Sequence, residues 1–214
     1  MAHKVELSLR RDLAQIAELV TGGSRVLDIG CGDGALLEYL ATHFQVDGRG
    51  MELSQAGVNA CVARGLSVVQ GDADLDLASY PTHGFDYAIL SQTIQATKYP
   101  DRVLAELVRI GRRAIVSLPN FGHWRIRNQV LWRGRMPRTM TLGYEWYDTP
   151  NIHLCTLADF KDLCQKLNIT IERFIPCHRD GQAMMMSLAR LPIFANLLAD
   201  QAVFVLSQNA EPPP

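Results

Sequence analysis

The sequence predicts an α/β protein built on a doubly wound, mainly parallel sheet of seven strands. Three observations support this prediction. Apolar runs bounded by turn residues alternate with segments of helical periodicity. The first apolar run leads directly into three closely spaced glycines and a helix. The 214 residues are enough for one domain with a substantial core, which we assign to residues 1–210.

The first half of the chain is expected to begin with an amphipathic helix. Its apolar residues Leu9, Leu13, Ile16 and Val20 recur at helical spacing, and a glycine pair at 22–23 ends it. The elements expected next are strands at residues 25–29, 45–52 and 67–71, with helices over 35–40 and 58–64 between them. This alternation is typical of parallel strands joined by helical crossovers.

The second half keeps this alternation only at first. A long irregular insertion is expected at residues 121–150, and Thr156 is a typical N-cap for the helix that follows it. The last strand enters late, which allows an antiparallel orientation, and residues 211–214 are interpreted as a disordered tail. The elements expected here are strands at 85–91 and 113–118, helices over 100–110 and 157–167, and strands at 169–175 and 202–207.

Bulk composition argues against several classes of partner. A net charge of −1 gives no overall attraction to nucleic acid or anionic lipid. The apolar stretches are too short to span a bilayer, and the N-terminal residues lack an apolar signal core. The cysteines are widely spaced without a C-x-x-C pair, so we expect neither a disulfide framework nor a metal site: Cys31, Cys61, Cys155, Cys164 and Cys177. We interpret them as buried reduced thiols and therefore expect a cytoplasmic protein.

The glycine-rich turn after the first strand is the main functional signal. Gly30, Gly32 and Gly34 surround Cys31 and Asp33 and lead into a helix. Glycine allows backbone with positive φ and lets a ligand approach where a Cβ would exclude it. Amide groups at the start of the helix would also face that ligand. The turn predicts a nucleotide-type pocket at the carboxyl end of a parallel sheet, although a glycine turn without a ligand remains an alternative.

Two cofactor classes use such a turn. Gly30, Gly32 and Ala35 satisfy the dinucleotide pattern G-x-G-x-x-G/A, which leaves an NAD-dependent enzyme as an alternative. The tighter G-x-G-x-G with Asp28 ahead of it resembles motif I of class I S-adenosylmethionine (SAM) methyltransferases. An ionised Asp28 would repel a pyrophosphate but attract the ammonium and sulfonium groups of SAM. We therefore favour SAM or its product S-adenosylhomocysteine as the cofactor.

Further cofactor contacts are expected where the next strands end. Glu52 lies twenty residues after Gly32, where a carboxylate accepts hydrogen bonds from ribose hydroxyls. In methyltransferase-like sequences an acid after the third strand approaches the adenine amino group, which makes Asp72 the candidate. A solvated acid is the alternative interpretation of both residues. The remaining expected contacts are Leu53, Ala73 and Ser91.

The insertion concentrates aromatic and basic residues. Five arginines against Glu145 and Asp148 give residues 121–150 a local charge of +3. Such residues anchor protein interfaces, and they also bind single-stranded nucleic acid, which the neutral chain disfavours. A lid packed on the sheet edge is the third interpretation. The candidate partner or lid residues are Trp124, Arg125, Trp132 and Trp146.

Two longer motifs resemble the MetW family of methionine biosynthesis proteins. They are Ser117-Leu-Pro-Asn-Phe-Gly-His-Trp-Arg-Ile-Arg127 and Tyr144-Glu-Trp-Tyr-Asp-Thr-Pro-Asn-Ile-His-Leu-Cys-Thr156, supported by residues 28–34 and 50–54. This resemblance implies a Rossmann-like class I SAM methyltransferase fold and a role in methionine synthesis. It also implies a link to homoserine O-acyltransferase (MetX), which proteins of this family accompany and support. His123 and His153 fall in these motifs, and we interpret both as hydrogen-bonded structural residues.

Two functional hypotheses follow. The first is a SAM-binding accessory or regulatory subunit of homoserine O-acyltransferase. The second is an active SAM-dependent methyltransferase acting on a small-molecule acceptor, with the insertion as its lid. The sequence names no catalytic acid or base, and methyl transfer by positioning alone does not require one.

Overall fold

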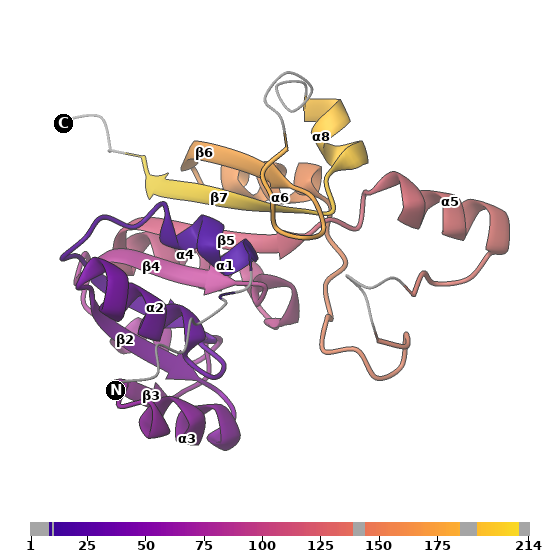
Figure 1. Ribbon diagram of the computed structural model, residues 1–214. Helices are drawn as coiled ribbons and strands as arrows, with labels where there is room; N and C mark the ends of the chain where they lie inside the picture. The colour runs from indigo at the N-terminus through magenta and orange to yellow at the C-terminus, as the bar shows by residue number, and fades with distance from the viewer. Residues whose placement is uncertain (1–8, 10, 139–143, 185–191, 210–214) are drawn as a thin grey trace.

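The computed structural model describes residues 9, 11–138, 144–184 and 192–209, which are arranged around one seven-stranded sheet (Figure 1). The strand order is β3-β2-β1-β4-β5-β7-β6. Strands β1 to β5 pair in parallel, whereas β7 runs antiparallel to both β5 and β6. The predicted mainly parallel sheet is therefore confirmed. The strands are β1 (Arg25–Ile29), β2 (Asp47–Glu52), β3 (Val68–Gln70), β4 (Phe85–Ser91), β5 (Gly111–Pro119), β6 (Ile169–Cys177) and β7 (Gln201–Gln208).

Helices cover both faces of this sheet. On one face α1 and α2 pack over β1 and β4, and on the other α4 and α6 enclose the larger cluster of buried apolar residues. The α-helices are α1 (Arg11–Ala17), α2 (Ala35–Phe44), α3 (Gln55–Ala63), α4 (Pro100–Ile110), α5 (Trp124–Arg133), α6 (Leu157–Lys166) and α8 (Pro192–Leu198). Two short 3₁₀ helices are η1 (Leu77–Ser79) and η2 (Ile94–Ala96).

The central strands are apolar on both faces because both faces are covered. In β1, Leu27 and Ile29 belong to the cluster beneath α4 and α6, whereas Val26 belongs to the cluster beneath α1 and α2. This matches the alternation of side chains along a strand. Asp28 interrupts the apolar run at a position that is only 3% exposed. A charged residue at such a position requires a partner or a function.

The structure corrects the prediction for the insertion. Residues 121–150 were expected to be irregular, but residues 124–133 form helix α5. His123 caps its start through a hydrogen bond from the backbone N–H of Arg125, and Gly134 ends it with φ of 58°. Only Ile126 is buried in this helix. A helix with so little buried surface has no apolar period in its sequence, which is why the pattern did not predict it.

Other differences concern boundaries. Helix α3 begins three residues before the predicted start because the Ser54 hydroxyl accepts from the backbone of Gly57 and caps it. Helix α1 ends at Ala17, earlier than its apolar spacing predicted. The predicted tail at residues 211–214 lies outside the described residues. Within the described part, no helix combines the length and hydropathy needed to cross a membrane.

Candidate cofactor-binding site

The glycine turn joins β1 to α2 at the carboxyl end of the parallel strands. Gly30, Gly32 and Gly34 have φ values of 70°, 58° and 79°. The backbone N–H of Gly30 donates to the carbonyl of Met51 in β2 (2.8 Å), and Gly34 donates to the carbonyl of Cys31 (2.9 Å). The first bond fixes the turn against the neighbouring strand, and the second closes the turn itself, so the conformation depends on the sheet as well as on the loop.

The three glycines have different surroundings. A Cβ on Gly30 would lie 2.9 Å from the hydroxyl of Thr93, and one on Gly34 would lie 2.4 Å from Leu66. Packing therefore explains these two positions. At Gly32 nothing lies within 4 Å of the Cβ position. Gly32 thus presents open backbone, which is what close approach of a ligand requires.

Asp28 lies in β1 just before this turn. One of its carboxylate oxygens, Oδ1, is buried and has no hydrogen-bond partner within the described structure. Burial, and secondarily the negative charge of Glu52, raise the pKa of Asp28 to about 7. Unpartnered buried polar atoms are rare in folded proteins, and at a functional site they often indicate a missing partner. A cation such as the ammonium group of SAM fits this requirement.

Glu52 ends β2 and contacts the turn directly. Its Oε2 accepts from the backbone N–H of Gly32 (2.9 Å), while Oε1 accepts from the backbone N–H and hydroxyl of Ser54 (2.9 and 2.8 Å). Three of about four lone-pair positions on the carboxylate are therefore used. Glu52 braces the turn and the start of α3, and one acceptor position remains available for a hydroxyl.

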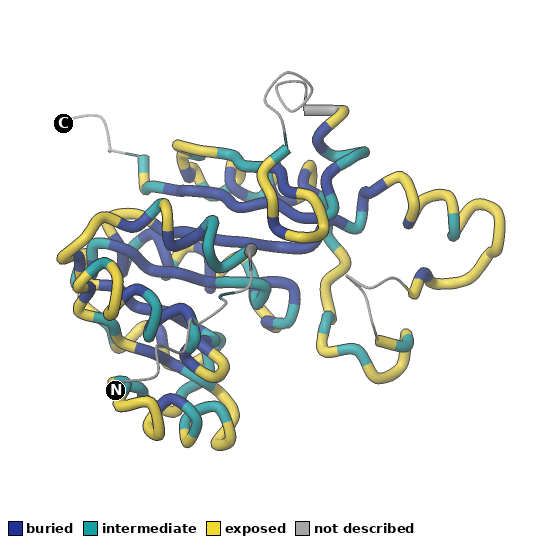
Figure 2. Tube along the Cα trace, in the orientation of Figure 1, coloured by how far each residue is buried: buried dark blue, intermediate teal, exposed yellow. Residues whose placement is uncertain are grey.

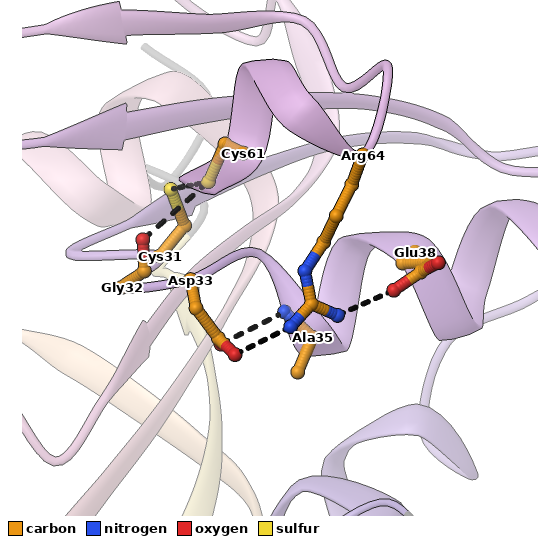
Figure 3. Close-up of polar contacts among 7 residues, drawn as sticks. All are labelled: Cys31, Gly32, Asp33, Ala35, Glu38, Cys61 and Arg64. Atoms are coloured by element: carbon orange, nitrogen blue, oxygen red, sulfur yellow. Dashed lines mark hydrogen bonds and ion pairs between the residues drawn. The ribbon is translucent and has the colours of Figure 1, made fainter. Parts of the chain in front are cut away.

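Cys31 points from the turn into the space between α2 and α3. Its Sγ lies 3.8 Å from Sγ of Cys61, and the Cys61 thiol donates to the carbonyl of Gly32 (3.4 Å), as Figure 3 shows. Burial raises the pKa of both thiols above the usual value, so neither is an activated nucleophile. Cys31 was predicted as a cofactor contact, and the structure packs its side chain beneath the turn.

Arg64, at the C-terminal end of α3, is a residue that the sequence analysis did not identify. Its guanidinium donates to Asp33 Oδ2 (2.7 Å) and to Glu38 Oε2 (2.5 Å). Figure 3 shows these two contacts, together with the bond from the Ala35 backbone to Asp33 Oδ1 (3.2 Å). Arg64 thereby connects α3 with the middle of the glycine turn and the first turn of α2. The sequence separation of these residues left no local signal for this contact.

The acidic turn after β3 contains a second missed residue. Asp72 Oδ1 accepts from the backbone of Asp74 (2.9 Å), whereas the carboxylate of Asp74 accepts from the backbones of Lys98 and Tyr99 (both 2.9 Å). Asp74 thus holds the segment before α4, and Asp72, which is half-buried, stabilises its own turn. Ala73 packs against the larger core.

The remaining predicted contacts differ in exposure. Leu53 is exposed beside Glu52. The hydroxyl of Ser91, at the end of β4, lies 3.2 Å from that of Ser117 in β5. Thr93, two residues after Ser91, lies against the glycine turn at Gly30. The structure therefore brings Asp28 and Glu52 to the turn, with Thr93 against its other side.

The insertion extends from the same edge of the sheet as the turn, because it follows the carboxyl end of β5. Trp124 is partly exposed, and the guanidinium of Arg125 lies 5.4 Å from its ring centroid. Trp132 and Trp146 are 78% and 74% exposed. These two rings are therefore largely exposed and not packed on the sheet edge, and their assignment as partner or lid residues stays a prediction.

His123 begins this segment and is almost completely buried. Its Nδ1 accepts from the backbone of Arg125 (3.2 Å), and its Nε2 lies 3.8 Å from Asp200 Oδ1. Burial lowers the pKa of His123, while the charge of Asp200 partly opposes this effect. The neutral ring therefore caps α5 through one nitrogen and faces Asp200 with the other.

The chain matches the protein family described as "Methionine biosynthesis protein MetW" over residues 10–206. The bifunctional methionine biosynthesis protein MetXA/MetW of Rhodopirellula baltica is 34% identical over 176 residues, which is 78% of this chain and 28% of that protein. A fatty-acid O-methyltransferase of Mycolicibacterium smegmatis is 37% identical over 95 residues, 42% of this chain and 34% of that one. The chain thus spans about a third or less of the length of these curated relatives.

Solved structures resemble the whole fold. An S-adenosylmethionine dependent methyltransferase from Mesorhizobium loti gives a TM-score of 0.67 at 16% identity, covering 94% of this chain and 99% of that one. At this level of identity the likeness concerns the fold alone. It confirms the predicted class I SAM methyltransferase fold.

Proposed function

The chain belongs to the methionine biosynthesis protein MetW family, and from this premise we propose that it binds SAM and acts as an accessory, regulatory partner of homoserine O-acyltransferase. The observation that carries the SAM proposal is the buried, unpartnered Oδ1 of Asp28 beside the open turn at Gly32. Asp28 would hold the ammonium group, and Glu52 would accept from a ribose hydroxyl.

The other predicted residues complete this proposed site. Asp72 and Ala73 lie on the turn after β3, where we propose that they face the adenine, with Leu53 on the neighbouring edge. Backbone around Cys31, Gly30 and Gly34 would line the amino-acid end of the cofactor. When bound, SAM supplies a positively charged sulfonium that Asp28 and Glu52 would attract.

The partnership is supported by the Rhodopirellula relative, whose printed name joins MetXA and MetW in one protein. SAM is made from methionine, so its binding to an accessory subunit would inform an early enzyme about the level of a late product. A ligand that binds two states of a complex with different affinities shifts the activity of that complex. We propose this regulatory coupling without assigning its sign.

The test measures binding and activity separately. Isothermal titration of the purified chain with SAM and S-adenosylhomocysteine tests the cofactor proposal, and the absence of heat at millimolar ligand would remove it. Acyl transfer by the homoserine O-acyltransferase of the same organism is then followed with and without the chain, at several SAM concentrations. We expect the chain to bind the enzyme and change its rate, and an unchanged rate without complex formation would refute the partnership.

An active methyltransferase is the second candidate, favoured by the similarity to a fatty-acid O-methyltransferase over 42% of the chain. Positioning an acceptor in line with the methyl carbon is enough for such a reaction. Formation of S-adenosylhomocysteine together with a methylated product would establish this activity. The accessory role predicts SAM binding without turnover.

A further inference from the structure

Helix α5 exposes apolar side chains on a segment that projects from the body of the protein. Figure 2 shows α5 and the chain after it extending away from the sheet, with mostly exposed residues. Leu131 and Trp132 are 76% and 78% exposed, and Val130 is 45% exposed. Three consecutive large apolar residues at this exposure are unusual for a surface that contacts only water.

The helix contributes little to the core of its own chain. Ile126 is its one buried residue. An isolated helix of ten residues is only marginally stable in water. The stability of α5 therefore depends on its His123 cap, on Gly134 at its end and on further contacts along its surface. Val130, Leu131 and Trp132 occupy successive positions, which lie about 100° apart around a helix, so they surround the last turn of α5 instead of forming one face. A partner that encloses this end of the helix would bury all three.

The charges around the apolar residues indicate the chemistry of the partner surface. Helix α5 contains no acidic residue. Within residues 11–138, 144–184 and 192–209, no carboxylate forms an ion pair with Arg133 or Arg135, whereas Arg138 pairs with Glu145 (2.5 Å). A matching surface would therefore be apolar at its centre and acidic at its rim.

We propose that Val130, Leu131 and Trp132, flanked by Arg133 and Arg135, form the surface that docks on homoserine O-acyltransferase. This inference rests on the partnership proposed above and assigns its location. Both α5 and the glycine turn follow the carboxyl ends of parallel strands, β5 and β1, so the docking helix and the candidate cofactor site share one edge of the sheet. That shared edge gives a short route by which cofactor binding would affect the partner.

The test compares the intact chain with variants in full-length complexes. Leu131→Glu and Trp132→Glu each place a carboxylate in the proposed apolar centre and should weaken binding to the acyltransferase at least tenfold. Val62→Glu is the matched control, since Val62 is a helical apolar residue that is 59% exposed on α3. It should bind like the intact chain. Replacing Arg133 and Arg135 together with glutamine should slow association and reduce its dependence on salt.

Each outcome separates the docking surface from the partnership. Thermal unfolding and SAM titration of every variant show whether the fold and the cofactor site survive. If the intact chain fails to bind the acyltransferase, the partnership and this surface are both refuted. If the intact chain binds and both glutamate variants bind equally well, the surface is refuted and the partnership stands. A dimer of this chain that Leu131→Glu dissociates, with acyltransferase binding unchanged, would assign the surface to a second copy and overturn the proposal.

Discussion

Replacing Asp28 with asparagine removes a buried charge while keeping the shape of the side chain. Asp28 is 3% exposed, and its Oδ1 has no partner within the described residues. Folding raises its pKa from 3.8 to about 7. At 1.36 kcal/mol for each pKa unit, ionised Asp28 destabilises the folded protein by roughly 4 kcal/mol. Asp28→Asn should recover this lost free energy of unfolding.

The sign follows from the direction of the pKa shift. Well below pH 4 Asp28 is protonated in both the folded and the unfolded chain, so burying it costs no stability through ionisation. As the pH rises from about 4 to 7, the unfolded chain releases the proton first and wild-type stability falls. Above pH 7 the loss is constant. Asp28→Asn has no such titration, so its stability relative to wild type should rise by about 1.4 kcal/mol for each pH unit across this window.

The assay is urea unfolding at several pH values between 4.5 and 8.5. Asp47→Asn, at an exposed position in β2, is the control for removing a carboxylate from the sheet. An imperfectly hydrogen-bonded amide at position 28 would change the free energy of unfolding by the same amount at every pH. The pH dependence of the difference between variant and wild type therefore reports the ionisation of Asp28. A difference between Asp28→Asn and wild type that does not change with pH would refute the assignment of Asp28 as a buried group that ionises near neutrality.

The same variant tests the cofactor proposal. The ammonium of SAM should pair with ionised Asp28, and a charge-assisted contact is worth about 1.5–3 kcal/mol. Asp28→Asn should therefore bind SAM roughly tenfold to a hundredfold more weakly at pH 8. Wild-type affinity should fall below pH 7 as Asp28 takes up its proton, while the variant should lack this dependence. Equal affinities at pH 8 would separate Asp28 from the site.

Three further predictions concern the turn. Glu52→Ala should weaken SAM binding about tenfold to a hundredfold, and unchanged affinity in titration calorimetry would remove Glu52 from the site. Gly32→Ala and Gly23→Ala both place a methyl group at positive φ, where nothing lies within 4 Å. Each should lower the free energy of unfolding in urea by about 1–2 kcal/mol. Only Gly32→Ala should also lose SAM binding. Equal SAM affinities in the two would contradict close approach at Gly32. Arg64→Met should change the free energy of unfolding by less than about 1 kcal/mol, because the ion pairs of Arg64 are partly solvated. It should nevertheless increase amide hydrogen exchange at the glycine turn. Unaltered exchange would show that Arg64 does not restrain the turn.

Sequence patterns were sufficient where the information is local. All seven expected strands are present, and the fold class is confirmed. Apolar runs marked the central strands β1, β4, β5 and β7 most clearly, because these strands are covered on both faces. The family followed from the long motifs around Ser117 and Tyr144 and is confirmed over residues 10–206. Helix α5 was missed because a helix with one buried residue leaves no period to detect. The assignment of individual cofactor contacts stays a prediction.

The sequence by itself determined the order of the strands, the helices between the parallel strands, and the glycine turn between the first strand and the next helix. Those features depend on residues close together in the chain, whose backbone preferences and side-chain spacing are visible in the letters. Tertiary structure decided that Asp28 is buried without a partner, that Arg64 connects α3 to the turn, and that Leu131 and Trp132 stay exposed. These properties depend on which distant segments the sheet brings together, because burial and charge pairing are set by neighbours in space.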